Sequence, residues 1–426
     1  GDVFGNGMLL SKVTKLLAAF NHAHIFVDPT PDPAASFAER ERLFNLPRSS
    51  WRDYNASLIS KGGGIFDRGA KSIPITPETR TALGIDAGVA AMSGEELIRA
   101  ILRAPVDLLY NGGIGTYVKA STEEHQDVGD RANDRVRVDA KEVRAKVVSE
   151  GGNLGFTQKA RLELARQGVL LNTDAIDNSG GVDMSDHEVN IKILMSILLK
   201  AGALKNLEAR NKLLAEMTEE VADLCLADND RQTLAITLDV MRSKAALDEH
   251  LDCIDALVEA QFLSPHDDSV PPRDILRRDF AEAGLPRPLL SVLLSETKRY
   301  LFEAVLASSF PDSPEGASLL ASYFPERLQK EYAKHFAAHP LKREIIGTVA
   351  VNHIVNTAGI AFVHRAMKAS GKDAGTVFAA FYKAANAGDA AKKRAAILAE
   401  PLDAKARQSK LLAFETELGA QVLKAL

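Results

Sequence analysis

Three short apolar segments, each followed by a loop that contains asparagine and glycine, constrain this chain more than any other feature of its sequence. The segments cover residues 106–110, 146–149 and 169–173, and the loops after them contain Asn111, Asn153 and Asn178. Short apolar runs that alternate with helical patterns predict strands joined by crossover helices, and hence a parallel sheet. The carboxyl ends of parallel strands meet at one edge of the sheet, where open α/β proteins bind ligands.

The asparagines in these loops suit a cofactor. A side-chain amide both donates and accepts hydrogen bonds, so it can pair with a carboxamide or with a ribose. A single Asn-Gly loop is only a turn. Three such loops at the same edge of one sheet predict a cofactor crevice.

The beginning of the chain carries another glycine-rich turn. Gly5 and Gly7 flank Asn6, and Met8 leads into an apolar stretch, so we expect a helix over 9–21. A glycine turn that opens a helix can hold a phosphate, because backbone N–H groups and the helix dipole face the anion. The spacing differs from G-x-G-x-x-G, and the alternative interpretation is an ordinary glycine turn.

Asp28 ends the next apolar segment, which we expect to be a buried strand over 24–28. It lies 21 positions after Gly7, the spacing at which dinucleotide folds place the carboxylate that binds the adenosine ribose. A carboxylate here would repel a 2′-phosphate, which favours NAD over NADP. The alternative is that Asp28 only caps a turn before Pro29.

These patterns predict an α/β Rossmann-like, doubly wound domain over residues 1–185 and an all-α region over 186–426. The first strand of the Rossmann-like sheet is missing from the sequence. We therefore expect the strands near Ile25 and Val106 to lack their shared neighbour, which would leave two unpaired edges. This pattern suggests that the chain is a fragment of a longer protein.

Composition narrows the possible functions. Hydrophobic residues make up 46% and charged residues 26% of the 426 residues, as in a soluble protein of two or three domains. The net charge of −5 argues against a nucleic-acid partner, and no apolar run is long enough to cross a bilayer. Cys225 and Cys253 lie in apolar, helix-like surroundings, so we expect them to be buried in a protein of the reducing cytoplasm.

No metal site is predicted. Neither cysteine has a zinc-like partner spacing, and the 10 histidines form no His-x-x-x-His cluster. Lys61 precedes three glycines, which could form a second anion loop, but a turn is favoured.

Two blocks of sequence resemble a known family. Glu150-Gly151-Gly152-Asn153 and the block from Asn178 to Ser185 are similar to the cofactor domain of glutamate dehydrogenases. The opening block and several segments of the helical tail are similar to one branch, the large bacterial NAD-specific glutamate dehydrogenases. These segments are 1–9, 287–294, 323–325 and 339–346. The resemblance covers essentially the whole chain.

The resemblance implies that L-glutamate, NAD and water react to give 2-oxoglutarate, ammonium and NADH. It places Gly5, Asn6, Gly7 and Met8 against the pyrophosphate, Asp28 at the adenosine ribose, Asn111 and Gly112 near the cofactor, and Asn153 and Asn178 at the nicotinamide and its ribose. Ser185 matches the serine that binds the side-chain carboxylate of the substrate, although the residues after it, 186–188, depart from the usual pattern. Gly152 and Ser179 replace alanines of smaller relatives.

The resemblance also implies which groups this chain lacks. The catalytic lysine and carboxylate lie in a substrate domain before the cofactor domain, and Lys61 occupies the wrong position in the chain to be that lysine. We therefore expect these residues alone to be inactive and to belong to a homo-oligomer. Two alternatives stay open: a dehydrogenase of another amino acid, and a non-catalytic nucleotide-binding or assembly module.

Overall fold

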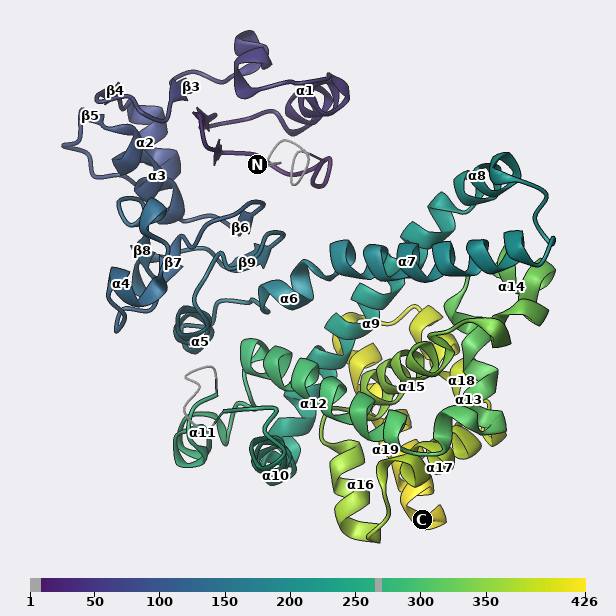
Figure 1. Cartoon of the computed structure of the whole chain (residues 1–426). Coiled ribbons are helices and arrows are strands. Elements are labelled where there is room, and N and C mark those ends of the chain that lie inside the picture. Colours follow the sequence, from purple (N-terminus) through teal and green to yellow (C-terminus); the bar gives the residue numbers. More distant parts are fainter. Residues whose placement is uncertain (1–8, 265–269) are drawn as a thin grey trace. The chain divides into compact units, whose positions relative to one another are not determined.

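The computed structural model of the chain describes residues 9–264 and 270–426 (Figure 1). Contacts divide the chain into two units, Gly1–Asn178 and Ser179–Leu426. All the described strands belong to the first unit, and the described part of the second unit is built of helices and their connections. The predicted boundary after residue 185 falls inside the first helix of the second unit, α7 (Ser179–Lys200).

The first unit mixes short strands with short helices. Its strands are β1 (Ala18–Phe20), β2 (His24–Val27), β3 (Gly64–Asp67), β4 (Ile73–Pro74), β5 (Ala91–Met92), β6 (Leu108–Asn111), β7 (Val118–Lys119), β8 (Val138–Asp139) and β9 (Val147–Glu150). Its α-helices are α1 (Pro33–Asn45), α2 (Pro77–Leu83), α3 (Gly94–Leu102), α4 (His125–Val128), α5 (Gln158–Arg166) and α6 (Asp174–Asp177).

The first sheet is antiparallel, in the order β1-β2-β3. Ile25 of β2 lies opposite Phe20 of β1 and Phe66 of β3. The strand predicted over 24–28 is therefore confirmed, and its apolar residues are fully buried. The expectation of an unpaired edge is wrong for this strand, because β1 and β3 occupy both of its edges. In the described sheets, the strand near Val106, β6, pairs with β9 alone, and no strand is shared between β2 and β6.

The helix predicted over 9–21 is also wrong. Residues 9–17 form turns and irregular structure, and 18–20 form β1. Apolar periodicity in so short a segment does not separate a helix from a strand. Pairing with β2 decides the outcome, since the peptide N–H of Asp28 also donates to the carbonyl oxygen of Leu17 at 2.8 Å.

Two pairs of strands are parallel, and the sequence predicts the first of them. β6 pairs with β9, and β7 pairs with β8. The strand predicted over 169–173 is reduced to a single parallel bridge between Leu170 and Val147. The described sheets are small, so the doubly wound arrangement stays a prediction.

One apolar core joins the strands and helices of the first unit. Its members include Ile25 of β2, Leu97 of α3, Val148 of β9 and Leu164 of α5. A capping box opens α3 at Ser93: the Ser93 hydroxyl accepts from the N–H of Glu96, whose carboxylate accepts from the N–H of Ser93. This cap fixes where α3 begins and thus which face it buries.

The second unit confirms the predicted all-α region. Its helices are α7, α8 (Leu207–Glu216), α9 (Thr218–Ala245), α10 (Leu247–Glu259), α11 (Arg273–Phe280), α12 (Arg287–Ala307), α13 (Pro314–Leu320), α14 (Glu326–Tyr332), α15 (Lys342–Ala358), α16 (Phe362–Ser370), α17 (Ala374–Ala387), α18 (Ala390–Ala399) and α19 (Ala404–Ala425). α7 packs against α9, and α12 packs against α15. Cys225 and Cys253 are buried, as expected.

The helices of the described residues were compared with the dimensions of a bilayer. None of them alone has the length and apolar composition of a membrane span. α15 and α16 reach that composition only as a pair, and they are bent by 91° against each other.

Candidate functional site

The carboxyl ends of β6 and β9 bring two of the predicted loops together. Asn111 is the last residue of β6 and lies opposite Glu150, the last residue of β9. A Cβ atom on Gly152 would lie only 2.7 Å from the carbonyl oxygen of Gly113, so glycine lets the two loops approach this closely. The parallel register thus places both loops at one edge.

The side chain of Asn111 has a vacant donor. Its Nδ2 is buried and donates no hydrogen bond to any described residue. A Cβ atom on Gly155 would lie 1.8 Å from that nitrogen, so the glycine makes room for the amide. A buried amide without an acceptor costs about 1–3 kcal/mol, which a ligand oxygen would offset.

Asn153 and Asn178 come into direct contact. Nδ2 of Asn178, the residue after α6, donates to Oδ1 of Asn153 at 2.9 Å. Asn153 is exposed and Asn178 is half-buried, so the pair lies at the surface of the first unit. Each amide retains further donor or acceptor positions that a ligand could use.

A buried ion pair between Glu150 and Arg161 holds these loops in place. Arg161 of α5 donates from Nε to Oε1 of Glu150 at 2.7 Å and from Nη2 to Oε2 at 2.9 Å. Arg161 also pairs with Asp174 Oδ1 at 3.0 Å. The Glu150 and Arg161 side chains are 1% and 5% exposed, and burial raises the pKa of Glu150 against the opposing effect of Arg161.

Two further carboxylates hold the backbone of the loops. Asp177 accepts from the peptide N–H of Glu150 at 3.0 Å and from Nδ2 of Asn172 at 2.8 Å. Asp174 accepts from the N–H of Leu154 at 2.7 Å. Leu154 has a φ of 57°, which lies in the left-handed region. This backbone conformation is unfavourable for leucine, so it persists only where neighbouring groups hold the backbone in place. The loop that carries Asn153 is therefore rigidly placed.

The carboxylate of Asp28 is buried and only 1% exposed. Its Oδ1 accepts from the N–H of Ser60 at 3.0 Å and from the Ser60 hydroxyl. Its Oδ2 is buried and accepts no hydrogen bond from the described residues. The structure thus leaves one carboxylate oxygen of Asp28 without a donor, but covers it.

The remaining sequence-predicted residues differ in how they are placed. Gly5, Asn6, Gly7 and Met8 lie outside the described residues. Gly112 is half-buried in the loop after β6. Ser185 is exposed on α7, where its hydroxyl donates to the carbonyl oxygen of Gly181 at 3.0 Å.

Lys61 does not have the properties of a catalytic lysine. Its side chain is 91% exposed, and its Nζ lies 2.8 Å from Glu78 Oε1. The hydrogen bond to Glu78 raises the pKa of Lys61, whereas catalysis at neutral pH needs a lysine with a lowered pKa. Lys61 and Gly62 form a turn, and Gly64 already begins β3.

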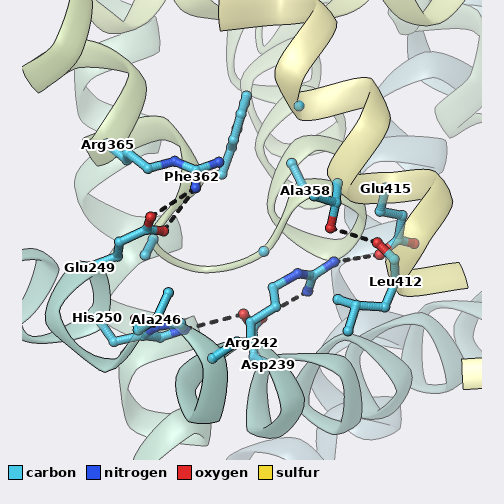
Figure 2. Close-up of a pocket in the computed structure, with 15 residues that line it drawn as sticks. Asp239, Arg242, Ala246, Glu249, His250, Ala358, Phe362, Arg365, Leu412 and Glu415 are labelled. Carbon is cyan, nitrogen blue, oxygen red and sulfur yellow. Dashed lines mark hydrogen bonds and ion pairs between the residues drawn. The ribbon is translucent and has the colours of Figure 1, made fainter. Parts of the chain in front are cut away.

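A hollow of about 190 Å³ lies in the second unit between α9, α10, α16 and α19. Figure 2 shows that its charged side chains point toward one another. Arg242 pairs with Glu415 and Asp239, and Arg365 donates to both carboxylate oxygens of Glu249. Each of these charged groups already has a partner within the hollow, so the hollow is less suited to a charged ligand than the loops at β6 and β9.

Comparisons with known proteins identify the family of the chain. The family described as bacterial NAD-glutamate dehydrogenase, catalytic domain, matches residues 1–239. The family described as glutamate dehydrogenase, C-terminal, matches residues 282–423. These matches identify the class as glutamate dehydrogenases.

Similar proteins from three bacteria identify a narrower class within the glutamate dehydrogenases. The NAD-specific glutamate dehydrogenase of Mycobacterium tuberculosis is 51% identical over 370 residues, 86% of this chain. Those of Halomonas elongata and Pseudomonas aeruginosa are 49% and 50% identical over 382 and 387 residues, each match covering 89% of this chain. The chain belongs to the bacterial NAD-glutamate dehydrogenase family. It spans about a quarter of the length of these curated relatives, 23% or 24% in each case.

The sequence did not predict the ion pairs that Arg161 makes with Glu150 and Asp174. Glu150, Asp174 and Asp177 could be seen as acids that follow apolar segments. Nothing in the spacing of Arg161 shows that it is buried between them, because this depends on how α5 packs.

Proposed function

We propose that this chain binds NAD within an NAD-dependent glutamate dehydrogenase and that its first unit is Rossmann-like. The full reaction converts L-glutamate, NAD and water into 2-oxoglutarate, ammonium and NADH. One observation carries the proposal: Asn111, Asn153 and Asn178 end up at the carboxyl edge of β6 and β9, with donors and acceptors to spare. Membership of the family supports the choice of cofactor and substrate.

Each asparagine has a role in this proposal. The buried Nδ2 of Asn111 donates to a cofactor oxygen, which gives it the acceptor that it lacks. Asn153 and Asn178 weaken the hydrogen bond between their side chains when the cofactor binds. Their amides then bond to the carboxamide and the ribose at the nicotinamide end. Bound NAD supplies the hydride acceptor, and the rigid loops fix where that acceptor lies.

The other contacts follow the same assignment. Asp28 binds the adenosine ribose through Oδ2, after the side chains that cover it shift. Gly5, Asn6, Gly7 and Met8 bind the pyrophosphate, and Ser185 binds the substrate carboxylate. The lysine and the carboxylate that move protons come from outside residues 1–426, and the complete enzyme is a cytoplasmic homo-oligomer.

Fluorescence titration with NADH tests the proposal on the folded chain. Asn153→Ala and Asn178→Ala should each weaken NADH binding about five- to tenfold, since a lost hydrogen bond is worth about 1 kcal/mol. Asn211→Ala, which removes an exposed amide on α8, is the matched control and should bind like the wild type. Unchanged NADH affinity in both site variants, with native circular dichroism, would refute the assignment of these loops.

A further inference from the structure

Three potential metal ligands from two helices meet inside the second unit. Asp183 and His187 lie one turn apart on α7, and Cys225 lies on α9. One ligand atom of each residue lies within 4.8 Å of the other two. His187 is 3% exposed and Cys225 is 5% exposed. Ligands one turn apart on one helix, joined by a side chain from the facing helix, are a common way to build a metal site in a helical bundle.

Two atoms of this cluster are buried without a hydrogen-bond partner among the described residues. They are Nδ1 of His187 and Oδ2 of Asp183. The Asp183 carboxylate has one hydrogen-bonding neighbour in the cluster, the Cys225 thiol. Nε2 of His187 lies 4.0 Å from Oδ1 of Asp183, which is too far for a hydrogen bond. Burying polar atoms in this way is costly, and a cation held by both groups would remove the cost.

The cluster is held in place by its neighbours. The His187 ring stacks on Tyr323, with ring centroids 4.6 Å apart. The Tyr323 hydroxyl donates to Asp186 Oδ2 at 2.6 Å and accepts from Asn190 Nδ2 at 2.9 Å, which fixes the tyrosine. Outer contacts of this kind orient the ligands of protein metal sites.

A hydrogen bond near the start of α7 fixes the distance between the two helices. Nδ2 of Asn229 on α9 donates to Oγ of Ser179 on α7 at 2.9 Å. Cys225 lies one turn before Asn229 on α9, so its thiol faces α7 from a defined position. The three ligands therefore come from elements whose relative placement does not depend on a metal.

We propose that Asp183, His187 and Cys225 bind a divalent ion of the zinc class, which fastens α7 to α9. The thiol, imidazole and carboxylate are together the ligands that zinc prefers, and a thiolate disfavours magnesium and calcium. Zinc bonds of about 2.0–2.3 Å place tetrahedral ligand atoms about 3.5 Å apart, so ligand atoms that lie within 4.8 Å of one another move closer by at most about 1.3 Å. Binding releases the Cys225 thiol proton to solvent, and water fills the fourth position.

The charges around the cluster favour a cation. Asp228 lies one turn after Cys225 on α9, and Asp186 lies beside the tyrosine. Lys298 is the ammonium group that faces Asp183 and Asp228. Arg231 also pairs with Asp228, at 2.7 Å. The three carboxylates of Asp183, Asp186 and Asp228 still outnumber the two cations, Lys298 and Arg231.

Cobalt substitution tests the proposal on the full chain, because a cobalt–thiolate bond gives a near-ultraviolet absorption band. Titration of the metal-free protein with Co²⁺ should give this band with a stoichiometry of one, and Zn²⁺ should abolish it by displacement. Cys225→Ser should remove the band, whereas Cys253→Ser, which replaces the other buried thiol, should keep it. Absence of the band in the folded wild type would overturn the proposal, and so would its persistence in Cys225→Ser.

Asp183→Asn keeps the test valid if Cys225→Ser does not fold. This isosteric change keeps the thiol but removes the charge, and it should weaken Co²⁺ binding at least tenfold. Equal Co²⁺ affinity in Asp183→Asn and the wild type would overturn the site. None of these readouts depends on NAD binding, so the two proposals fail separately.

Discussion

The replacement of Arg161 by methionine should destabilise the first unit strongly. Arg161 makes a two-point contact with Glu150 and a third contact with Asp174, and both partners of the main pair are buried. Methionine fills a similar volume but leaves the Glu150 carboxylate buried without its cation. Breaking a buried pair from one side costs about 3–5 kcal/mol. Part of this loss should be recovered at lower pH, because protonation removes the unpaired charge of Glu150.

Trp51 offers a specific assay for this variant. It is the only tryptophan of the chain, it lies in the first unit and it is 1% exposed. Its fluorescence during unfolding in urea should report the free energy of unfolding of that unit. Glu150→Gln is the matched control, with an expected loss of about 1–3 kcal/mol, since Arg161 keeps Asp174 and an amide oxygen. The free energy of unfolding should fall by more than about 1 kcal/mol in Arg161→Met. A smaller fall, or a fall in Glu150→Gln larger than that in Arg161→Met, would show that an unpaired Glu150 carboxylate does not destabilise the unit.

Three further predictions concern other parts of the chain. His353 is half-buried, and desolvation first, then Arg394 and Arg231, lower its pKa from 6.5 to about 4. Its neutral form is the one that the fold stabilises, so about 3 kcal/mol of stability, present above pH 6.5, should be lost as the pH falls to about 4. The loss of stability between pH 6.5 and about 4, followed by the helical circular dichroism signal during unfolding, should be smaller in His353→Gln than in the wild type. An identical pH dependence of stability in the two proteins would contradict this prediction. Gly152→Ala should cost about 1–3 kcal/mol by tryptophan-monitored unfolding, because its Cβ would press on the carbonyl oxygen of Gly113. Gly69→Ala, which meets nothing within 4 Å, is the control, and equal stabilities of the two variants would count against the close approach of the loops. Lys61→Met should leave NADH affinity unchanged in a fluorescence titration, because Lys61 is exposed and paired with Glu78, and a large loss would reopen the anion-loop interpretation.

Local patterns predicted much of the first unit. The apolar segments before Asn111 and Asn153 are parallel strands, and their loops meet as expected. The Ser-x-x-Glu pattern that begins at Ser93 is a further local signal, and it coincides with the start of α3. These features depend on residues close together in the sequence, which is why the sequence alone revealed them.

Features that depend on distant partners were not predictable. Residues 18–20 became a strand because β2 offers them an edge, and β3 closes the other edge of β2. The third apolar segment makes only one bridge, at Leu170. The cluster of Asp183, His187 and Cys225 has a recognisable spacing on α7, but its cysteine comes from another helix. Packing, and not local propensity, decides these outcomes.

We propose that Asn153 and Asn178 contact the nicotinamide end of NAD. Binding of NAD and of ADP-ribose, which lacks the nicotinamide, tests this most directly by isothermal titration calorimetry on the same variants. We expect Asn153→Ala and Asn178→Ala to weaken NAD binding about five- to tenfold and to leave ADP-ribose binding unchanged. Asp28→Ala should weaken both ligands. Equal losses for NAD and ADP-ribose in the asparagine variants would contradict the claim.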